Sequence, residues 1–192
     1  MLSRHWLYYH LARLRLLLRQ PEAAAATYRQ ALAANPRFAR AAAALGFLHA
    51  TRENYAEAVI AFREALRIHP GDADIWFDLG YVYQQQREFD QALESFRRAV
   101  ALRPSLDRAW YGMGLIYSAQ RDYARAVEVF KKAADLQPMN PHAYYELAMA
   151  HYALNNLDQV RKIIQRVSEF DPKVTQQLIG ETGQIPEGAE KR

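Results

Sequence analysis

Histidine is the residue type of this chain with the greatest capacity for acid–base catalysis and metal binding. The six histidines are His5, His10, His49, His69, His142 and His151. None pairs with another at the i, i+4 spacing that places two metal ligands on one helix face, and no HExxH motif occurs. The absence of cysteine from all 192 residues excludes disulfides, cysteine nucleophiles and thiolate metal sites. We therefore expect no metal and no cofactor.

Other catalytic signatures are missing as well. The sequence contains no glycine-rich phosphate-binding loop, no GxSxG nucleophile motif and no concentrated pair of carboxylates. His49 and His151 fall at places where a packing residue is expected, so both are interpreted as structural. The sequence predicts a protein that is not an enzyme.

The composition favours helices. Alanine, leucine and tyrosine are abundant, whereas glycine and proline contribute only 8 residues each. The N-terminal segment MLSRHWLYYHLARLRLLLRQ is apolar but is interrupted by Arg13, Arg15 and Arg19. A signal peptide needs an uninterrupted apolar stretch, so this segment is expected to be a helix of the mature protein.

Charge is distributed unevenly over a net charge of +4. Residues 1–38 contain six arginines and the single acidic residue Glu22, whereas the remainder is nearly balanced. A basic patch at Arg4, Arg13, Arg15 and Arg19 could attract nucleic acid or acidic lipid. The simpler interpretation, which we favour, is a solvated arginine-rich helix face.

A regular period organises the chain. Five of the eight prolines stand at equal intervals, at Pro36, Pro70, Pro104, Pro138 and Pro172. Other residues recur at the same interval, and residues 73–106 have the clearest series: Trp76, Leu79, Gly80, Tyr83, Ala92, Phe96, Ala99 and Pro104. The next unit repeats it as Trp110, Met113, Gly114, Tyr117, Ala126, Phe130, Ala133 and Pro138.

This pattern can be explained physically. Trp76, Leu79 and Tyr83 are three to four residues apart and therefore lie on one stripe of a first helix. Ala92, Phe96 and Ala99 form a matching stripe on a second helix. Proline then ends the second helix, because it lacks an amide donor and disfavours helix in the preceding residue. A single helix pair cannot bury these stripes alone, so neighbouring pairs must stack.

The series resembles the tetratricopeptide repeat, whose pattern is W-x2-L-G-x2-Y…A-x3-F…P. The resemblance implies an all-α, right-handed solenoid of five helix-turn-helix repeats, over residues 5–38, 39–72, 73–106, 107–140 and 141–174. We expect one solenoid domain over residues 1–180, including a short cap at residues 174–180. Residues 181–192 are expected to be a disordered tail.

Local signals mark the helix starts and the atypical end units. Asn54 and Asn156 are predicted N-caps of capping boxes, and Asn140 with Pro141 predicts another helix start. Arg15 occupies a place that is normally aromatic and buried. The last helix of the fifth repeat has a broad apolar face and no following repeat to cover it.

The resemblance also implies where a partner would bind. The family's groove-facing places lie two, five, nine and twelve residues into each repeat, on the first helices that line a concave surface. The partner-binding residues expected from these places are Arg40, Phe47, Asp74, Phe77, Tyr81, Gln84, Arg108, Tyr111, Leu115, Tyr145 and Met149. Each aromatic among them could instead be a core residue. No window fits the two-carboxylate clamp of heat-shock co-chaperones.

We therefore expect a non-catalytic adaptor or chaperone-like scaffold that holds a partner peptide or helix in the groove. One alternative is a scaffold that self-assembles through its terminal helices, by Trp6 and Tyr9 at one end and by Val160, Ile163, Ile164, Val167 and Phe170 at the other. The second alternative is the basic-patch binding described above. The arginine and alanine bias suggests a bacterial source, and a cytoplasmic location is expected without excluding the periplasm.

Overall fold

The computed structural model describes residues 3–186, and α-helix is the only regular secondary structure among them. Contacts between helices divide the chain into two compact units, Met1–Arg103 and Pro104–Arg192. We call them the N-terminal and the C-terminal unit. The expectation of one solenoid domain over residues 1–180 stays a prediction.

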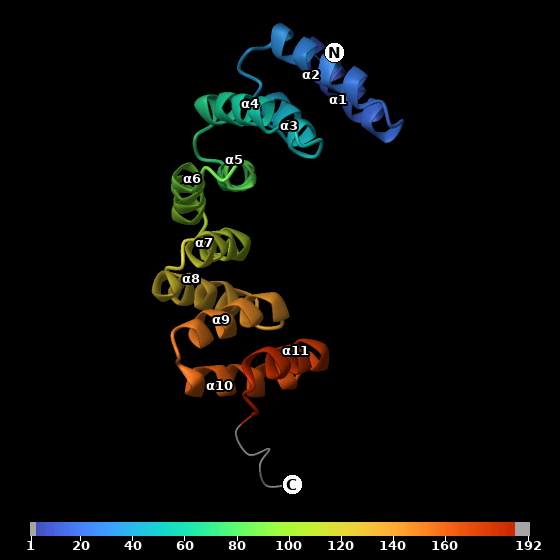
Figure 1. The fold of residues 1–192 in the computed structure, drawn as a ribbon. Coiled ribbons are helices and arrows are strands. Elements are labelled where there is room, and N and C mark those ends of the chain that lie inside the picture. The colour runs from blue at the N-terminus through green and yellow to red at the C-terminus, as the bar shows by residue number, and fades with distance from the viewer. Residues whose placement is uncertain (1–2, 187–192) are drawn as a thin grey trace. The chain divides into compact units, whose positions relative to one another are not determined.

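The N-terminal unit consists of three antiparallel helix pairs (Figure 1). Its helices are α1 (Arg4–Leu17), α2 (Pro21–Ala34), α3 (Ala39–Ala50), α4 (Tyr55–Ile68), α5 (Ala73–Gln85) and α6 (Phe89–Leu102). Each pair packs on the next through the contacts of α2 with α3 and of α4 with α5. These pairs are the first three expected repeats.

The C-terminal unit contains two helix pairs and one further helix. Its helices are α7 (Asp107–Ala119), α8 (Tyr123–Leu136), α9 (Pro141–Ala153), α10 (Leu157–Ser168) and α11 (Pro172–Thr182). Helix α11 packs against both α9 and α10, as a cap should. The cap is longer than residues 174–180, because Asp171 caps its start and Thr182 is buried at its end. Residues 187–192 of the expected tail lie outside the described residues.

In the second, third and fourth helix pairs, a glycine of the first helix packs against a phenylalanine of the second helix. A Cβ atom added to Gly46 would lie 2.7 Å from Phe62, and one added to Gly80 would lie 2.7 Å from Phe96. The same addition at Gly114 would lie closer still to Phe130. Each glycine therefore lets a fully buried phenyl ring of the second helix fit against the first helix.

The tryptophan and the proline of the repeat are joined by a hydrogen bond. Trp76 donates its indole N–H to the backbone carbonyl of Pro70, 2.9 Å away, and Trp110 does the same to Pro104, also at 2.9 Å. Within the N-terminal unit, the bond from Trp76 fixes the start of α5 relative to the end of α4.

The end units adapt the pattern. Arg15, half-buried at the place of the repeat's tyrosine, donates hydrogen bonds to the carbonyl of Ala23 and to the hydroxyl of the fully buried Thr27. Two of the expected side-chain caps do not form: Asn54 and Asn156 stand at the N-cap positions, but neither side chain accepts a capping hydrogen bond. Asn140 does accept one, from the amide of His142.

The turn inside each helix pair uses a left-handed residue. Arg19, Glu53, Arg87, Arg121 and Asn155 have φ values of 58–60° and stand at the same place in successive repeats. A left-handed conformation costs an ordinary L-residue about 1–2 kcal/mol. Glycine avoids this cost but loses about 0.5–1 kcal/mol through its more flexible unfolded chain.

We therefore expect Arg87→Gly and Arg121→Gly each to raise the free energy of unfolding by about 0.5–1 kcal/mol. Chemical denaturation monitored by circular dichroism measures this gain. Asn155→Gly is the control and should gain less, because asparagine tolerates the left-handed region. A loss of stability in the two arginine variants would contradict the prediction.

Candidate functional site

Two of the expected groove residues form an open aromatic pocket in the N-terminal unit. Phe47 of α3 and Tyr81 of α5 stand one repeat apart, and they are 59% and 45% exposed. They line a pocket of about 240 Å³ together with Ala50, Thr51, Glu53, Tyr55, Phe62 and Asp78. We call it the Phe47–Tyr81 pocket. Two exposed rings on rigid helices provide a large apolar contact area at little cost in rotamer freedom.

Other expected aromatic residues pack inside their own helix pairs. Phe77 is half-buried, and its ring centroid lies 5.7 Å from that of Phe96. Tyr111 has the same relation to Phe130, at 5.6 Å. Burial raises the pKa of the Tyr111 hydroxyl, and the nearby Glu146 raises it further. Both rings therefore support the helix pair more than they offer a contact surface.

The expected polar residues have various environments. Asp74 accepts two hydrogen bonds from the guanidinium of Arg103, at 3.0 and 2.8 Å, so its carboxylate is held within the N-terminal unit. The guanidinium of the exposed Arg40 lies over the ring of Trp6, 5.6 Å from its centroid. Gln84 is half-buried, whereas Arg108 of the C-terminal unit is exposed.

In the C-terminal unit the chain itself covers part of the expected groove. Leu115 and Met149 are half-buried at the positions equivalent to Tyr81. Tyr145 of α9 donates a hydrogen bond of 2.7 Å to the carboxylate of Glu181 on α11. This bond, together with burial, raises the pKa of Tyr145 to about 12. Helix α11 therefore occupies the place where a partner would meet Tyr145.

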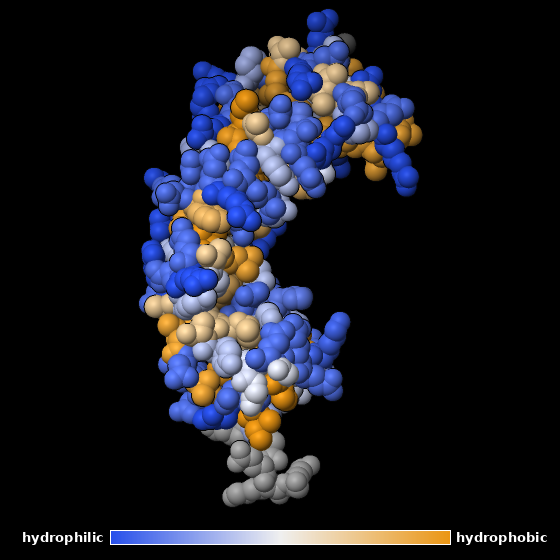
Figure 2. All heavy atoms as spheres, viewed as in Figure 1, coloured by the Kyte–Doolittle hydropathy of each residue, from blue (hydrophilic) through white to orange (hydrophobic). Residues whose placement is uncertain are grey.

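The two ends proposed for self-assembly differ. Val160, Ile163, Ile164 and Val167 of α10 are buried, and α11 packs on their helix. At the C-terminal end of α1, by contrast, Leu14, Leu17 and the C-cap residue Leu18 are 50%, 81% and 59% exposed, and Figure 2 shows hydrophobic surface at that end of the helix. Between these two ends, the described residues thus leave a sizeable apolar surface uncovered at α1 but not at α10, and self-assembly through α1 stays a prediction.

Basic-patch binding also stays a prediction. The guanidinium of Arg15 is used inside the helix pair, whereas Arg4, Arg13 and Arg19 are exposed. Across residues 3–186, no helix is long and apolar enough to cross a bilayer. Within the same residues, no group of three or more histidine, aspartate and glutamate side chains is placed to hold a metal ion.

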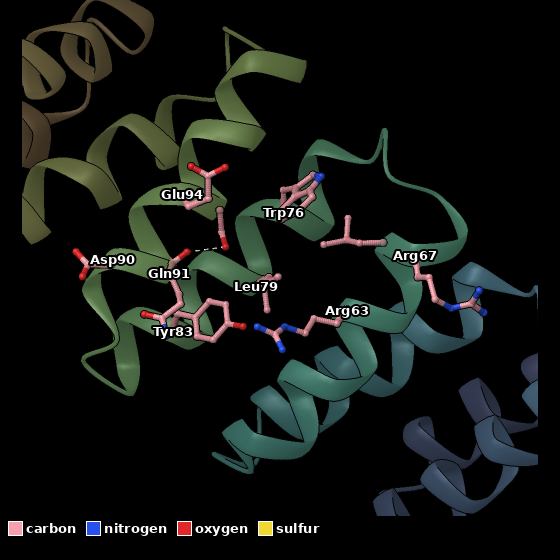
Figure 3. Close-up of a pocket in the computed structure, with 10 residues that line it drawn as sticks. Arg63, Arg67, Trp76, Leu79, Tyr83, Asp90, Gln91 and Glu94 are labelled. Atoms are coloured by element: carbon pink, nitrogen blue, oxygen red, sulfur yellow. Dashed lines mark hydrogen bonds between the residues drawn. The ribbon is translucent and has the colours of Figure 1, made fainter.

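A second pocket was not expected from the sequence. It measures about 570 Å³ and lies between α4 and α6, with α5 beneath it (Figure 3). Its lining consists of Arg63, Leu66, Arg67, Trp76, Leu79, Tyr83, Asp90, Gln91, Glu94 and Ser95. We call it the α4–α6 pocket. Sequence reasoning assigned Trp76, Leu79 and Tyr83 to the core, and no signal indicated that two neighbouring second helices would stand apart above them.

Four family models, each described as a tetratricopeptide repeat, match residues 7–38, 37–105, 77–138 and 117–178. Together they span nearly all of the chain. The chain belongs to the tetratricopeptide-repeat (TPR) family. The all-α TPR solenoid predicted from the regular period is thereby confirmed. Members of this family are non-catalytic protein-interaction modules.

Solved structures of other TPR proteins have the same fold. A crystal structure of MamA has a TM-score of 0.82 at 18% identity and covers 96% of this chain and 98% of its own. YrrB, described as a TPR protein with an unusual peptide-binding site, has a TM-score of 0.75 at 23% identity, with 88% and 89% covered. PilF from Pseudomonas aeruginosa has a TM-score of 0.75 at 22% identity, with 92% and 83% covered. No curated protein sequence is significantly similar to this chain.

Proposed function

We propose that this TPR protein is an adaptor or chaperone-like scaffold that holds a peptide or helix of a partner protein along its first helices. The observation that carries the proposal is the Phe47–Tyr81 pocket. Exposed aromatic side chains beside a pocket are the usual anchors of a protein–protein contact. The fold shared with YrrB, a protein described as binding peptide, supports the same class of partner.

The chemistry of the pocket suggests which partner segment fits. Phe47, Tyr55 and Tyr81 favour a large apolar side chain, and the acidic Glu53 stands at the same pocket. A segment that carries an apolar anchor next to a lysine or arginine would match both features. Because α11 covers Tyr145 in the C-terminal unit, we place the anchor contact in the N-terminal unit.

The test compares partner recovery by the native chain with that by the double variant Phe47→Ala/Tyr81→Ala. Proteins bound only by the native chain are identified, and their binding segments are measured by calorimetry. We expect the double variant to bind such a segment about tenfold or more weakly, because both anchor rings are removed. Leu102→Ala is the control, since Leu102 is 47% exposed on α6 and does not line the pocket.

Equal recovery of every partner by the native chain and the folded double variant would contradict the proposal. The exposed leucines of α1 would then be the next surface to test. Circular dichroism establishes that the variant is folded, and little effect on the fold is expected from trimming two exposed rings.

A further inference from the structure

We propose that the α4–α6 pocket is a second binding site, for a partner polypeptide segment that carries a large apolar side chain next to a carboxylate. The site lies on the far side of α5 from Tyr81. Tyr81 and Tyr83 are two positions apart, which corresponds to a rotation of about 200° around a helix. The site is thus separate from the Phe47–Tyr81 pocket and goes beyond the function proposed above.

The floor of the α4–α6 pocket suits an apolar side chain. Leu66 and Leu79 are buried beneath it, and the half-exposed indole of Trp76 forms one side. The indole N–H is already used by the carbonyl of Pro70, so the ring is held in place and presents its apolar surface. A volume of about 570 Å³ lies within the range of about 300–1,000 Å³ that is usual for ligand pockets.

Tyr83 supplies the observation that points to a ligand. Its side chain is only 5% exposed, yet its buried hydroxyl has no hydrogen-bond partner. Leaving such a group unsatisfied is unfavourable, because burial removes the hydrogen bonds that water would make with the hydroxyl. Figure 3 shows the hydroxyl pointing toward the guanidinium of Arg63, which also lines the pocket.

The same defect recurs one repeat earlier. Among the described residues, only one other buried side-chain atom lacks a partner, and it is Nδ1 of His49. His49 holds the place of Tyr83 in the preceding repeat, and it lines an equivalent pocket of about 220 Å³ between α2 and α4. Two unsatisfied groups at one register of the repeat indicate a property of this face rather than an isolated packing fault.

Arg63 identifies the chemistry that would satisfy Tyr83. Its guanidinium carbon lies 5.8 Å from the centroid of the Tyr83 ring, and within residues 3–186 it makes no ion pair. Its neighbours differ: Arg67 pairs with Glu64 at 2.8 Å, and Arg98 pairs with Glu94 at 2.9 Å. An exposed guanidinium and a buried hydroxyl side by side are both hydrogen-bond donors. A carboxylate accepts from both, and its planar geometry matches the guanidinium.

Repetition of the pocket favours a polypeptide as the occupant. The α2–α4 pocket provides Arg29 at the position of Arg63, and Leu32 and Leu45 at the positions of Leu66 and Leu79. A polypeptide can place one apolar side chain in each pocket and one carboxylate at each arginine. Asp90 on α6, which makes no ion pair in the described part of the chain, can accept N–H groups of the segment.

The experiment uses the full chain and two short probes, the acetylated and amidated dipeptides Leu–Glu and Leu–Gln. Nuclear magnetic resonance follows the indole N–H of Trp76 and the ring signals of Tyr83 as each probe is added. We expect saturable shifts with Leu–Glu and at least about fivefold weaker binding of Leu–Gln, because the second probe lacks the carboxylate.

Two variants distinguish recognition from packing. Arg63→Gln is expected to weaken Leu–Glu binding at least about fivefold and to leave Leu–Gln binding unchanged. Tyr83→Phe removes the unsatisfied hydroxyl, so it should raise the melting temperature while weakening Leu–Glu binding. If the role of Tyr83 were only structural, Tyr83→Phe would change the melting temperature and leave Leu–Glu binding unchanged. Arg87→Gln, which removes an exposed charge of the same unit away from the pocket, is the control.

The proposal would be overturned if Leu–Glu caused no saturable chemical-shift changes, or changes only at Phe47 and Tyr81. It would also be overturned if Arg63→Gln and the native chain bound Leu–Glu equally well. The double variant Phe47→Ala/Tyr81→Ala should bind Leu–Glu normally at Trp76. This double variant separates the two sites. If it no longer binds the partner segment but still binds Leu–Glu at Trp76, the two proposals are supported independently of each other.

Discussion

Replacing Phe130 with alanine is expected to lower the free energy of unfolding of the C-terminal unit by about 3–5 kcal/mol. Phe130 is fully buried on α8, where its ring fits against Gly114 and Tyr111 of α7. Alanine removes the ring and leaves a cavity that two rigid helices cannot close. The loss therefore includes the transfer free energy of the ring and the cost of the cavity.

The measurement is guanidinium denaturation followed through Trp110, which belongs to the same unit, together with hydrogen exchange of α7 and α8. Leu136→Ala on α8 is the control: Leu136 is 37% exposed, so the loss should be far smaller. A loss below about 1 kcal/mol for Phe130→Ala would show that α7 and α8 are not held by this ring. Because repeat arrays often unfold in parts, the signal of Trp110 is more informative than the average over the chain.

Gly114→Ala should destabilise the same helix pair by about 2 kcal/mol, although alanine is normally the better helix former. An added Cβ atom would lie 2.5 and 2.7 Å from two atoms of the Phe130 ring and closer still to a third. Real Cβ atoms do not approach so closely, so the ring or the helix must move. Overpacking of a buried core typically costs about 1–3 kcal/mol.

Gly180→Ala provides a matched control of opposite sign. Gly180 is also helical and belongs to the same unit, but an added Cβ atom would meet nothing within 4 Å. This substitution should stabilise the protein by up to about 1 kcal/mol. Adding Phe130→Leu to Gly114→Ala should recover part of the lost stability if the clash is the cause, and purely additive losses in a double-mutant cycle would contradict that cause.

Much of the fold could be predicted from the sequence because its determinants are local or periodic. The evenly spaced prolines predicted where the second helices of the first four repeats end, whereas Pro172 stands at the start of α11, and the helices observed agree with the five predicted repeats. Asn140 with Pro141 predicted a capped helix start correctly. The capping boxes at Asn54 and Asn156 were wrong in their hydrogen bonds, because a sequence spacing does not determine the rotamer of the capping side chain.

The candidate site was less predictable. Phe47, Phe77, Tyr81 and Tyr111 all occupy places that the family uses for its groove, yet Phe47 and Tyr81 are exposed whereas Phe77 and Tyr111 pack on the phenylalanine of their own pair. Helical spacing gives the direction in which a side chain leaves its helix. It does not show which neighbouring element lies in that direction.

By itself, the sequence determined the repeat, its register and the helix pairs, since each depends on residues at constant spacing. Only the tertiary structure decided that α11 covers Tyr145, that Arg15 bonds to Thr27, and that the hydroxyl of Tyr83 remains unsatisfied beside Arg63. Each of these three features depends on the relative position of side chains that belong to two different helices. They depend on how closely packed helices approach one another, which a pattern of residue types along the chain does not specify.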